Sequence, residues 1–191
     1  MSESKLGRSG RLSLLAMAAI VAVPPIVAYL LYLNWRPSAL MNYGELIKPV
    51  PLAEVVAPAE PALGELGKLK GKWVLLTVDG GGCDDYCRRK LYILRQLRLT
   101  QGKEMERIER AWLVDDDAAT GPALMEEYKG TARIPARGSA LLGALPVTGS
   151  VRDHVYIIDP LGNLMMRYPR NPDPNRMKKD LARLLRASRI G

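Results

Sequence analysis

The hydrophobic and polar positions of this chain fall into three zones. Residues 12–33 form a run of 22 residues without a charge. A helix of that length crosses a hydrocarbon core of about 30 Å, so the run predicts a transmembrane helix. Residues 34–66 alternate Pro, Ala, Leu and Glu without a period, which predicts an extended, Pro-rich tether. From residue 67 to residue 191, short apolar runs alternate with helical patterns, which predicts one folded domain.

The charges around residues 12–33 predict how the span is oriented. A cleaved secretory signal is the alternative interpretation, but its apolar region is only about 7–15 residues long and ends at small residues. Three basic residues precede the run and one follows closely: Lys5, Arg8, Arg11 and Arg36. The positive-inside rule then keeps residues 1–11 in the cytoplasm and exports the rest. In a bacterium this predicts a single-pass inner-membrane protein whose C-terminal domain lies in the periplasm, where disulfides are permitted.

Four strands and three helices are predicted within residues 67–191. The strands cover 73–78, 111–114, 155–158 and 164–168, and the helices cover 84–99, 122–129 and 174–188. Alternation of strands and helices gives parallel crossovers, and the turn at 159–162 makes the last two strands an antiparallel hairpin. This order predicts the α/β class, as a thioredoxin-like mixed sheet flanked by helices and preceded by the transmembrane helix.

Charge narrows the range of partners. The formal net charge is +8, and much of the excess lies near the C-terminus, at Arg167, Arg170, Arg176, Lys178, Lys179, Arg183, Arg186 and Arg189. A solvated helix face is the ordinary explanation, and contact with anionic lipid or an acidic protein is the alternative. No stacking aromatics interleave these charges, which argues against nucleic acid.

Residues 115–117, three consecutive aspartates, predict a solvated turn, because consecutive side chains do not converge on one cation.

The only two cysteines, Cys83 and Cys87, occur where an apolar strand pattern passes into a helical one. Residues four apart in a helix have Cα atoms about 6 Å apart, within the range that a disulfide accepts. The pair can therefore form a disulfide, exchange it as a catalytic dithiol with Cys83 as the more exposed attacking thiol, or hold a soft ion. A structural staple and unpaired small hydrophobes are the alternatives. Gly80–Gly82 have no side chains, so a substrate backbone could approach the cysteines there. A flexible loop is the alternative explanation of these glycines.

Several motifs resemble the Sco/SenC family of membrane-anchored cytochrome oxidase assembly proteins. They are the segment LKGKWVLL at 69–76, the Cys-x-x-x-Cys spacing entering a helix, WLVDD at 112–116, and Asp153-His154 before YIIDPLG at 156–162. The chain departs from the family at Asp84, where proline is usual, and at His154, which lies closer to the final strand. The resemblance covers roughly residues 67–188 and implies a thioredoxin-like domain on one N-terminal span.

The resemblance also implies a copper site made by Cys83, Cys87 and His154. Two thiolates and an imidazole suit copper, and Met165 or Met166 would add a thioether. It further implies a role in cytochrome c oxidase biogenesis, with an oxidase subunit or another assembly factor as partner. Two alternatives stay open at this stage. One is a general periplasmic thiol–disulfide oxidoreductase, and the other is a non-catalytic membrane assembly factor that retains the fold.

Overall fold

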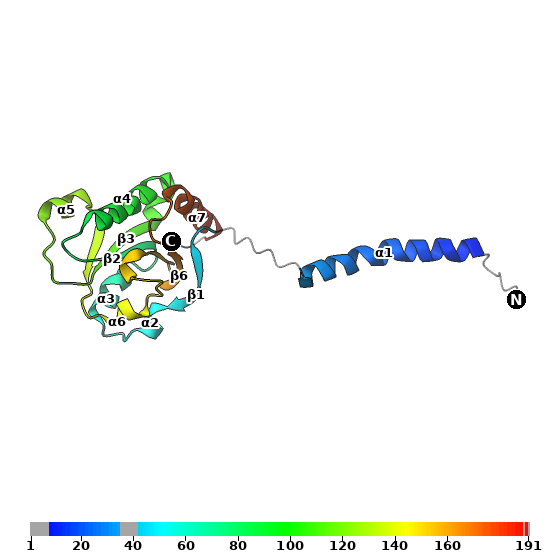
Figure 1. Cartoon of the computed structure of the whole chain (residues 1–191), viewed down its shortest axis with the longest axis horizontal. Helices are drawn as coiled ribbons and strands as arrows, with labels where there is room; N and C mark the ends of the chain where they lie inside the picture. The colour runs from blue at the N-terminus through cyan, green and yellow to red at the C-terminus, as the bar shows by residue number, and fades with distance from the viewer. Residues whose placement is uncertain (1–7, 35–41, 189, 191) are drawn as a thin grey trace. The chain divides into compact units, whose positions relative to one another are not determined.

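The computed structural model describes residues 8–34, 42–188 and 190, in two separate compact units. The first unit contains α1 (Arg8–Asn34), which continues as one helix through Pro24 and Pro25 (Figure 1). Among the described helices, α1 alone is long and apolar enough to cross a membrane, over Gly10–Leu33. Lys5 and Arg36, on which the predicted orientation depends, lie outside the described residues.

The second unit is built around a six-stranded mixed sheet. Its strands are β1 (Glu45–Pro51), β2 (Trp73–Asp79), β3 (Ile108–Val114), β4 (Thr131–Pro135), β5 (Val155–Ile158) and β6 (Asn163–Tyr168). They lie in the order β1-β6-β5-β2-β3-β4. β3 pairs parallel with β2 and β4, whereas β5 and β6 form an antiparallel hairpin beside β2. The predicted α/β class, with its parallel crossovers and its final hairpin, is confirmed.

Helices and short turns connect the strands. The helices are α2 (Leu52–Val55), α3 (Pro61–Gly67), α4 (Asp85–Leu99), α5 (Pro122–Glu127), α6 (Ala140–Ala144) and α7 (Pro174–Ala187). Two 3-10 helices, η1 (Gly102–Arg107) and η2 (Val151–Asp153), lead into β3 and β5. Two well-formed caps mark the starts of the longest helices of this unit, because Asp84 accepts from the amide of Cys87 and Asp173 accepts from the amides of Asn175 and Arg176.

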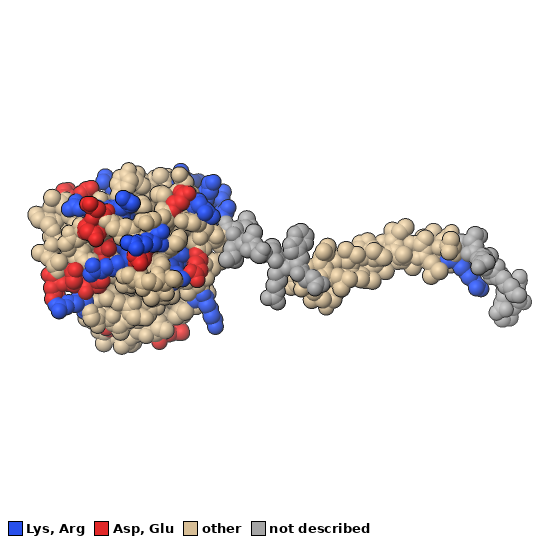
Figure 2. Space-filling view, in the orientation of Figure 1, with Lys and Arg blue, Asp and Glu red and all other residues tan. Residues whose placement is uncertain are grey.

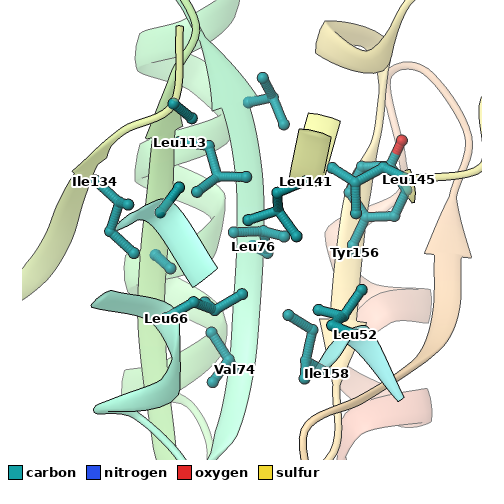
Figure 3. Packing of buried hydrophobic residues seen from close by; sticks show 14 of the residues in the cluster. Leu52, Leu66, Val74, Leu76, Leu113, Ile134, Leu141, Leu145, Tyr156 and Ile158 are labelled. Carbon is teal, nitrogen blue, oxygen red and sulfur yellow. The ribbon is translucent and has the colours of Figure 1, made fainter. Parts of the chain in front are cut away.

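The alternating side chains of the central strands divide the core into two layers. On one face, Val74, Leu76 and Val78 of β2 pack with residues of α2, α3 and α6, as Figure 3 shows for Leu76, Leu141 and neighbouring side chains. On the other face, Trp73 and Leu75 pack with residues of α4 and α7. Because β2 is buried on both faces, it needs apolar residues on both, which explains the nearly continuous apolar run at 73–78.

The predicted tether over 34–66 requires correction for residues 42–66. These residues form β1, α2 and α3, and β1 pairs with β6 at the edge of the sheet. Leu52, Val56 and Leu66 are buried in the core, so the compact unit begins at Asn42 rather than at residue 67. Three prolines of this segment lie where a missing backbone N–H removes few hydrogen bonds. Pro49 and Pro51 are in an edge strand, and Pro61 is in the first turn of α3.

Candidate functional site

The two cysteines lie at the junction of β2 and α4. β2 ends at Asp79, and a glycine turn leads to Cys83, whose φ of 44° is in the left-handed region. Asp84 then caps α4, its carboxylate accepting from the amide of Cys87 at 2.9 Å. Cys83 therefore lies just before the N-cap and Cys87 in the first turn of the helix, as the sequence predicts. Aspartate at position 84 has a local reason, since a proline at an N-cap has no side-chain acceptor.

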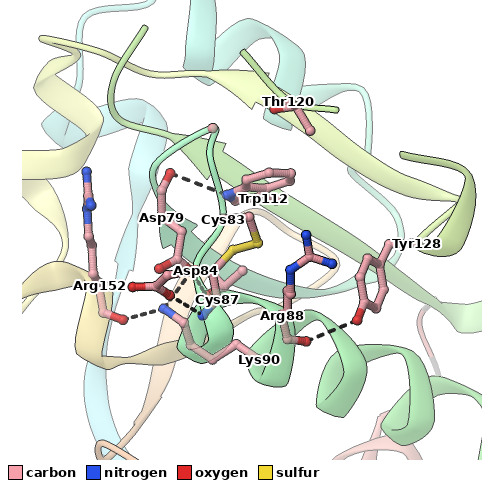
Figure 4. Close-up of a disulfide and its surroundings, with 12 residues drawn as sticks. Asp79, Cys83, Asp84, Cys87, Arg88, Lys90, Trp112, Thr120, Tyr128 and Arg152 are labelled. Atoms are coloured by element: carbon pink, nitrogen blue, oxygen red, sulfur yellow. Dashed lines mark hydrogen bonds and ion pairs between the residues drawn. A yellow bond between two sulfur atoms is a disulfide. The ribbon is translucent and has the colours of Figure 1, made fainter. Parts of the chain in front are cut away.

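Cys83 and Cys87 are joined by a disulfide, with Cα atoms 5.1 Å apart. Cys83 is 5% exposed and Cys87 is 1% exposed, so Cys83 is the more exposed of the two, as expected, although both are buried in the oxidised form. The sulfurs pack in a small apolar cluster of Leu91, Trp112, Val114, Leu124 and Tyr128. Figure 4 shows Trp112 and Tyr128 near the bridge, held by hydrogen bonds from Trp112 Nε1 to the Asp79 carbonyl and from the Tyr128 hydroxyl to the Arg88 carbonyl.

One polar hollow of about 290 Å³ reaches the disulfide. It is lined by Asp79, Gly80, Gly82, Cys83, Asp84, Cys87, Asp116, Ala118 and Arg152. A Cβ on Gly80 would collide with the Asp116 carboxylate, and one on Gly81 would collide with the Ala118 carbonyl. These two glycines are therefore required by close packing inside the protein, whereas Gly82 is exposed and leaves space beside Cys83.

A buried ion pair lies against this hollow. Lys90 Nζ is 2.7 Å from Asp79 Oδ2, and both side chains are almost completely buried. The ammonium also donates to the carbonyls of Val78 and Arg152, so each of its protons has an acceptor. Burial raises the pKa of Asp79 to about 6, against the opposing charge of Lys90. Burial likewise lowers the pKa of Lys90, and the Asp79 carboxylate opposes that shift.

The three aspartates after β3 form separate contacts. Asp115 pairs with Arg152 through two hydrogen bonds, at 2.6 and 2.8 Å. Asp116 accepts from the amides of Gly81 and Ala118, and these bonds lower its pKa. Asp117 pairs with Arg137. The expected solvated turn is thus a set of contacts in which Asp115 and Asp116 fix the loop before the disulfide, and the three carboxylates do not converge.

His154 faces the core rather than the disulfide. Its side chain is 4% exposed, with Nδ1 2.8 Å from the Tyr168 carbonyl and Nε2 3.1 Å from the Thr148 amide. Nε2 also lies 3.0 Å from the Thr148 carbonyl, so each ring nitrogen contacts a backbone carbonyl and its role as donor or acceptor depends on the tautomer. Both ring nitrogens are therefore engaged by backbone groups. The capping box of Ser150 and Asp153 sets this turn of the chain.

In the oxidised form that the structure shows, the residues of the copper site that the family resemblance implies are not arranged as ligands, because Cys83 and Cys87 share a disulfide. Over residues 8–34, 42–188 and 190, no group of three or more His, Cys, Asp or Glu side chains could hold a metal ion. Backbone groups of Tyr168 and Thr148 engage both ring nitrogens of His154, so the convergence of Cys83, Cys87 and His154 on copper stays a prediction for the reduced protein. Met166 is completely buried in the core and Met165 packs against it, so neither is free to supply a thioether.

Comparisons with known proteins agree with this architecture. The model of the family described as "transmembrane-like, thioredoxin-like, C-terminal domain" matches residues 73–188. The chain belongs to this family. No curated protein sequence matches the chain significantly.

Solved Sco structures share the fold. Yeast Sco1 with copper bound has a TM-score of 0.53 and 17% identity, covering 81% of this chain and 96% of that one. Arabidopsis thaliana ScoI with copper bound has a TM-score of 0.51 and 13% identity, covering 76% and 99%. Yeast Sco1 in a further structure has a TM-score of 0.50 and 18% identity, covering 63% and 84%. The resemblance of this chain to a divergent Sco/SenC-like protein is confirmed at the level of the fold.

The pairing of Asp79 with Lys90 is the feature that the sequence analysis missed. Two signals in the sequence point to it. Asp79 ends an otherwise apolar, buried strand, and Lys90 lies on the same face of α4 as the buried residues Cys87, Leu91 and Leu94. A lysine within an apolar helix face needs a buried partner, and a carboxylate at the end of the adjacent strand can provide one.

Proposed function

We propose that this chain is a membrane-anchored, Sco-like thiol–disulfide exchange protein in which Cys83 and Cys87 form the redox pair. One observation carries the proposal. The disulfide and a buried carboxyl with a pKa of about 6 line the same hollow, so a group able to exchange protons near neutral pH lies beside the sulfurs.

The exchange requires two thiol steps. In the reduced protein, the Cys83 thiolate attacks one sulfur of a substrate disulfide, forming a mixed disulfide and releasing the other substrate sulfur as a thiolate, which takes up a proton. Cys87 then loses its proton and attacks the Cys83 sulfur, which closes the Cys83–Cys87 bridge and frees the second substrate thiol. Two electrons pass from the protein to the substrate, and an external dithiol protein restores the reduced pair.

Asp79 and Lys90 have distinct parts in this scheme. The Asp79 carboxylate accepts the proton that Cys87 releases, and its pKa of about 6 allows it to return that proton to solvent. Lys90 is a positioning residue, because its ammonium holds the carboxylate at 2.7 Å and compensates its charge. Gly82, exposed and without a side chain, leaves room for an extended substrate segment beside Cys83.

The proposed setting is a bacterial inner membrane. The apolar helix α1 is the proposed anchor, and the basic residues before it support a periplasmic location for the folded domain. An exported domain is consistent with a disulfide, which persists in an oxidising compartment. The Sco-like fold supports cytochrome c oxidase biogenesis as the process and an oxidase subunit or another assembly factor as the partner. Copper has no step in this proposal, which concerns only the exchange of the Cys83–Cys87 disulfide.

The decisive measurement is the reduction potential of the Cys83–Cys87 pair in the full chain. The purified protein in nanodiscs is equilibrated with thiol buffers of graded potential, and free thiols are alkylated and counted by mass. An exchange-active pair is expected between about −270 and −120 mV, the range of thioredoxin-like exchange proteins, whereas structural bridges lie below about −300 mV. A potential in the lower range, together with no reduction of a fluorogenic glutathione disulfide, would reject exchange and favour the non-catalytic assembly factor.

Two variants connect this measurement to the site. Asp79→Asn is expected to slow exchange at pH 7 by about 100-fold, because one proton acceptor is lost. Asp117→Asn removes an equal charge from a side chain that is 70% exposed, and is expected to leave the rate unchanged. Cellular oxidase activity gives a separate test of the process. A strain that lacks the gene should lose oxidase activity, and should regain it with the wild-type chain but not with Cys83→Ser. If deletion of the gene leaves oxidase activity unchanged, the general oxidoreductase is favoured.

A further inference from the structure

The outward face of α7 carries only positive charge. Met177, Leu181 and Leu185 are buried against the sheet, and none of the large hydrophobic residues of α7 is exposed. The outward positions include Arg176, Lys178, Lys179, Arg183 and Arg186, together with Ala182, Ala187 and the half-buried Leu184. Figure 2 shows basic side chains gathered over the part of the domain where α7 lies in Figure 1. The helix therefore presents a cationic surface without an apolar centre, here called the α7 basic face.

Most of this charge is not neutralised inside the domain. Within the part of the chain that the structure describes, no carboxylate forms an ion pair with Lys178, Lys179 or Arg186. The only acidic residue of α7, Asp180, is 1% exposed and points inward. Arg183 of the same helix, by contrast, pairs with Asp180, and Arg152 and Arg167 pair with Asp115 and Glu45.

The start of the domain is bound to this same helix. The Asp180 carboxylate accepts hydrogen bonds from the amides of Tyr43 and Gly44, both at 2.9 Å. The Arg176 guanidinium lies 4.1 Å from the centre of the Tyr43 ring, and the Asp173 amide donates to the Tyr43 hydroxyl at 3.1 Å. These contacts hold Tyr43 and Gly44, and with them the point where the chain enters the domain, against α7.

The connector to the proposed anchor is short. α1 ends at Asn34 and the domain begins at Asn42, so seven residues, 35–41, join them. A chain extends at most about 3.6 Å per residue, which limits the connector to roughly 25 Å. The domain is therefore joined to the proposed anchor by a short segment, and α7 holds Tyr43 and Gly44 close to where that segment ends.

We infer that the α7 basic face binds anionic lipid headgroups of the membrane in which α1 is anchored. Clustered basic residues near a membrane surface are attracted to its anionic lipids, and this attraction acts within about 8 Å at physiological salt. A protein partner fits this face less well, because protein interfaces depend on large apolar or aromatic anchors at their centre, and no large apolar side chain of α7 is exposed. The inference rests on the anchored topology of the proposed function and is independent of the chemistry of Cys83 and Cys87.

The experiment separates docking from anchoring. The full chain, with a site-specific protease sequence inserted between Pro37 and Ser38, is reconstituted into vesicles of phosphatidylcholine alone or with a quarter of phosphatidylglycerol. After cleavage of the connector, the fraction of the released domain that sediments with the vesicles is measured at low salt and at high salt. The expected result is retention on the anionic vesicles only, reversed by high salt.

Variants identify the surface. The triple variant Lys178→Gln, Lys179→Gln, Arg186→Gln is expected to partition onto anionic vesicles on the order of 100-fold more weakly. The matched control Lys68→Gln, Lys103→Gln, Lys129→Gln removes the same charge from exposed positions on other elements, and should bind as the wild type does. Thermal unfolding of both variants verifies that each is folded, and glutathione disulfide reduction is expected to be equal in both.

Three results would overturn the inference. Release of the wild-type domain from anionic vesicles at low salt would show that lipid does not hold it, and would favour an acidic protein as the partner of this face. Equal retention of the triple variant and the wild type would assign binding to another surface. Loss of the uncleaved chain from the vesicles on alkaline washing would remove the anchored topology on which the inference rests, while the measured redox activity would still stand or fall by itself.

Discussion

The disulfide and His154 form an instructive comparison, because the family resemblance joins them in one copper site and the fold separates them. Beside the disulfide lies a hollow with a buried ion pair, and the charges of Asp79 and Lys90 are kept there at an energetic cost. Around His154, both ring nitrogens are engaged by backbone groups of Tyr168 and Thr148. The region of the disulfide contains a carboxyl group that can gain or lose a proton. The polar atoms of His154, in contrast, contact the backbone and stabilise the fold. A residue that matches a family motif therefore predicts the chemistry of that family only where its side-chain atoms are free to bind or react.

The largest expected effect on stability comes from removing the cation of the buried pair. Lys90→Met keeps most of the aliphatic volume but leaves Asp79 without its counter-charge, which should lower the unfolding free energy by about 3–5 kcal/mol. Urea denaturation measures the change, and Lys103→Met, at an exposed position, is expected to stay within about 0.5 kcal/mol of wild type. The double variant Asp79→Leu, Lys90→Met should recover most of the loss. A Lys90→Met protein as stable as the control would mean that the pair is not buried as described.

The next effect is the pH dependence that Asp79 confers on stability. Its pKa is about 6 in the folded protein and 3.8 in the unfolded reference, so the folded state binds the proton more tightly between these values. The contribution of Asp79 to the unfolding free energy is complete below about pH 4 and falls as pH rises to 6, by about 3 kcal/mol in total.

Denaturation curves at pH 4 and pH 7 for wild type and Asp79→Asn provide the measurement. The wild type should lose about 3 kcal/mol relative to this variant across that interval. Asp117→Asn, which removes one exposed carboxylate, serves as the reference for a simple change of net charge. If the wild type gained stability relative to Asp79→Asn over the same interval, the pKa of Asp79 would be lowered rather than raised.

The smallest effect is expected at His154. His154→Phe keeps an aromatic ring but leaves the Tyr168 carbonyl and the Thr148 amide without their partner, at a cost of about 2 kcal/mol. The affinity of the reduced chain for Cu(I), measured by competition with a chromogenic chelator, should change by no more than about twofold. A tenfold weaker Cu(I) affinity in this variant would mean that His154 reaches the sulfurs and that the comparison drawn above is wrong.

Much of the fold was predictable from local patterns. The apolar run at 73–78 and the hairpin at 155–168 correspond to β2, β5 and β6, and the helical patterns at 84–99 and 174–188 correspond to α4 and α7. Local periodicity is strong wherever an element is buried on one or both faces, because burial determines residue type at each position. The predicted positions of Cys83 and Cys87 around the start of α4 follow from the same local pattern.

The missed strands share a physical cause. β1 contains two prolines and β4 ends in one, and both strands lie at the edges of the sheet with partly exposed side chains. Edge strands need only one neighbour, so their sequences lack the continuous apolar pattern of a central strand. β1 also pairs with β6 more than a hundred residues away along the chain, as the bond between Arg167 and Glu45 illustrates, and such a pairing leaves no local signal.

The sequence by itself determined the apolar helix, the strand–helix order and two thiols close enough to bond, because each depends on residues near one another along the chain. Only the tertiary structure decided that Asp79 meets Lys90, that Gly80 and Gly81 lie under the loop after β3, and that His154 turns toward Tyr168. Those contacts depend on how β2, β3, β5 and β6 are aligned in the sheet. Strand alignment results from packing of the whole core, which no short segment of the chain specifies.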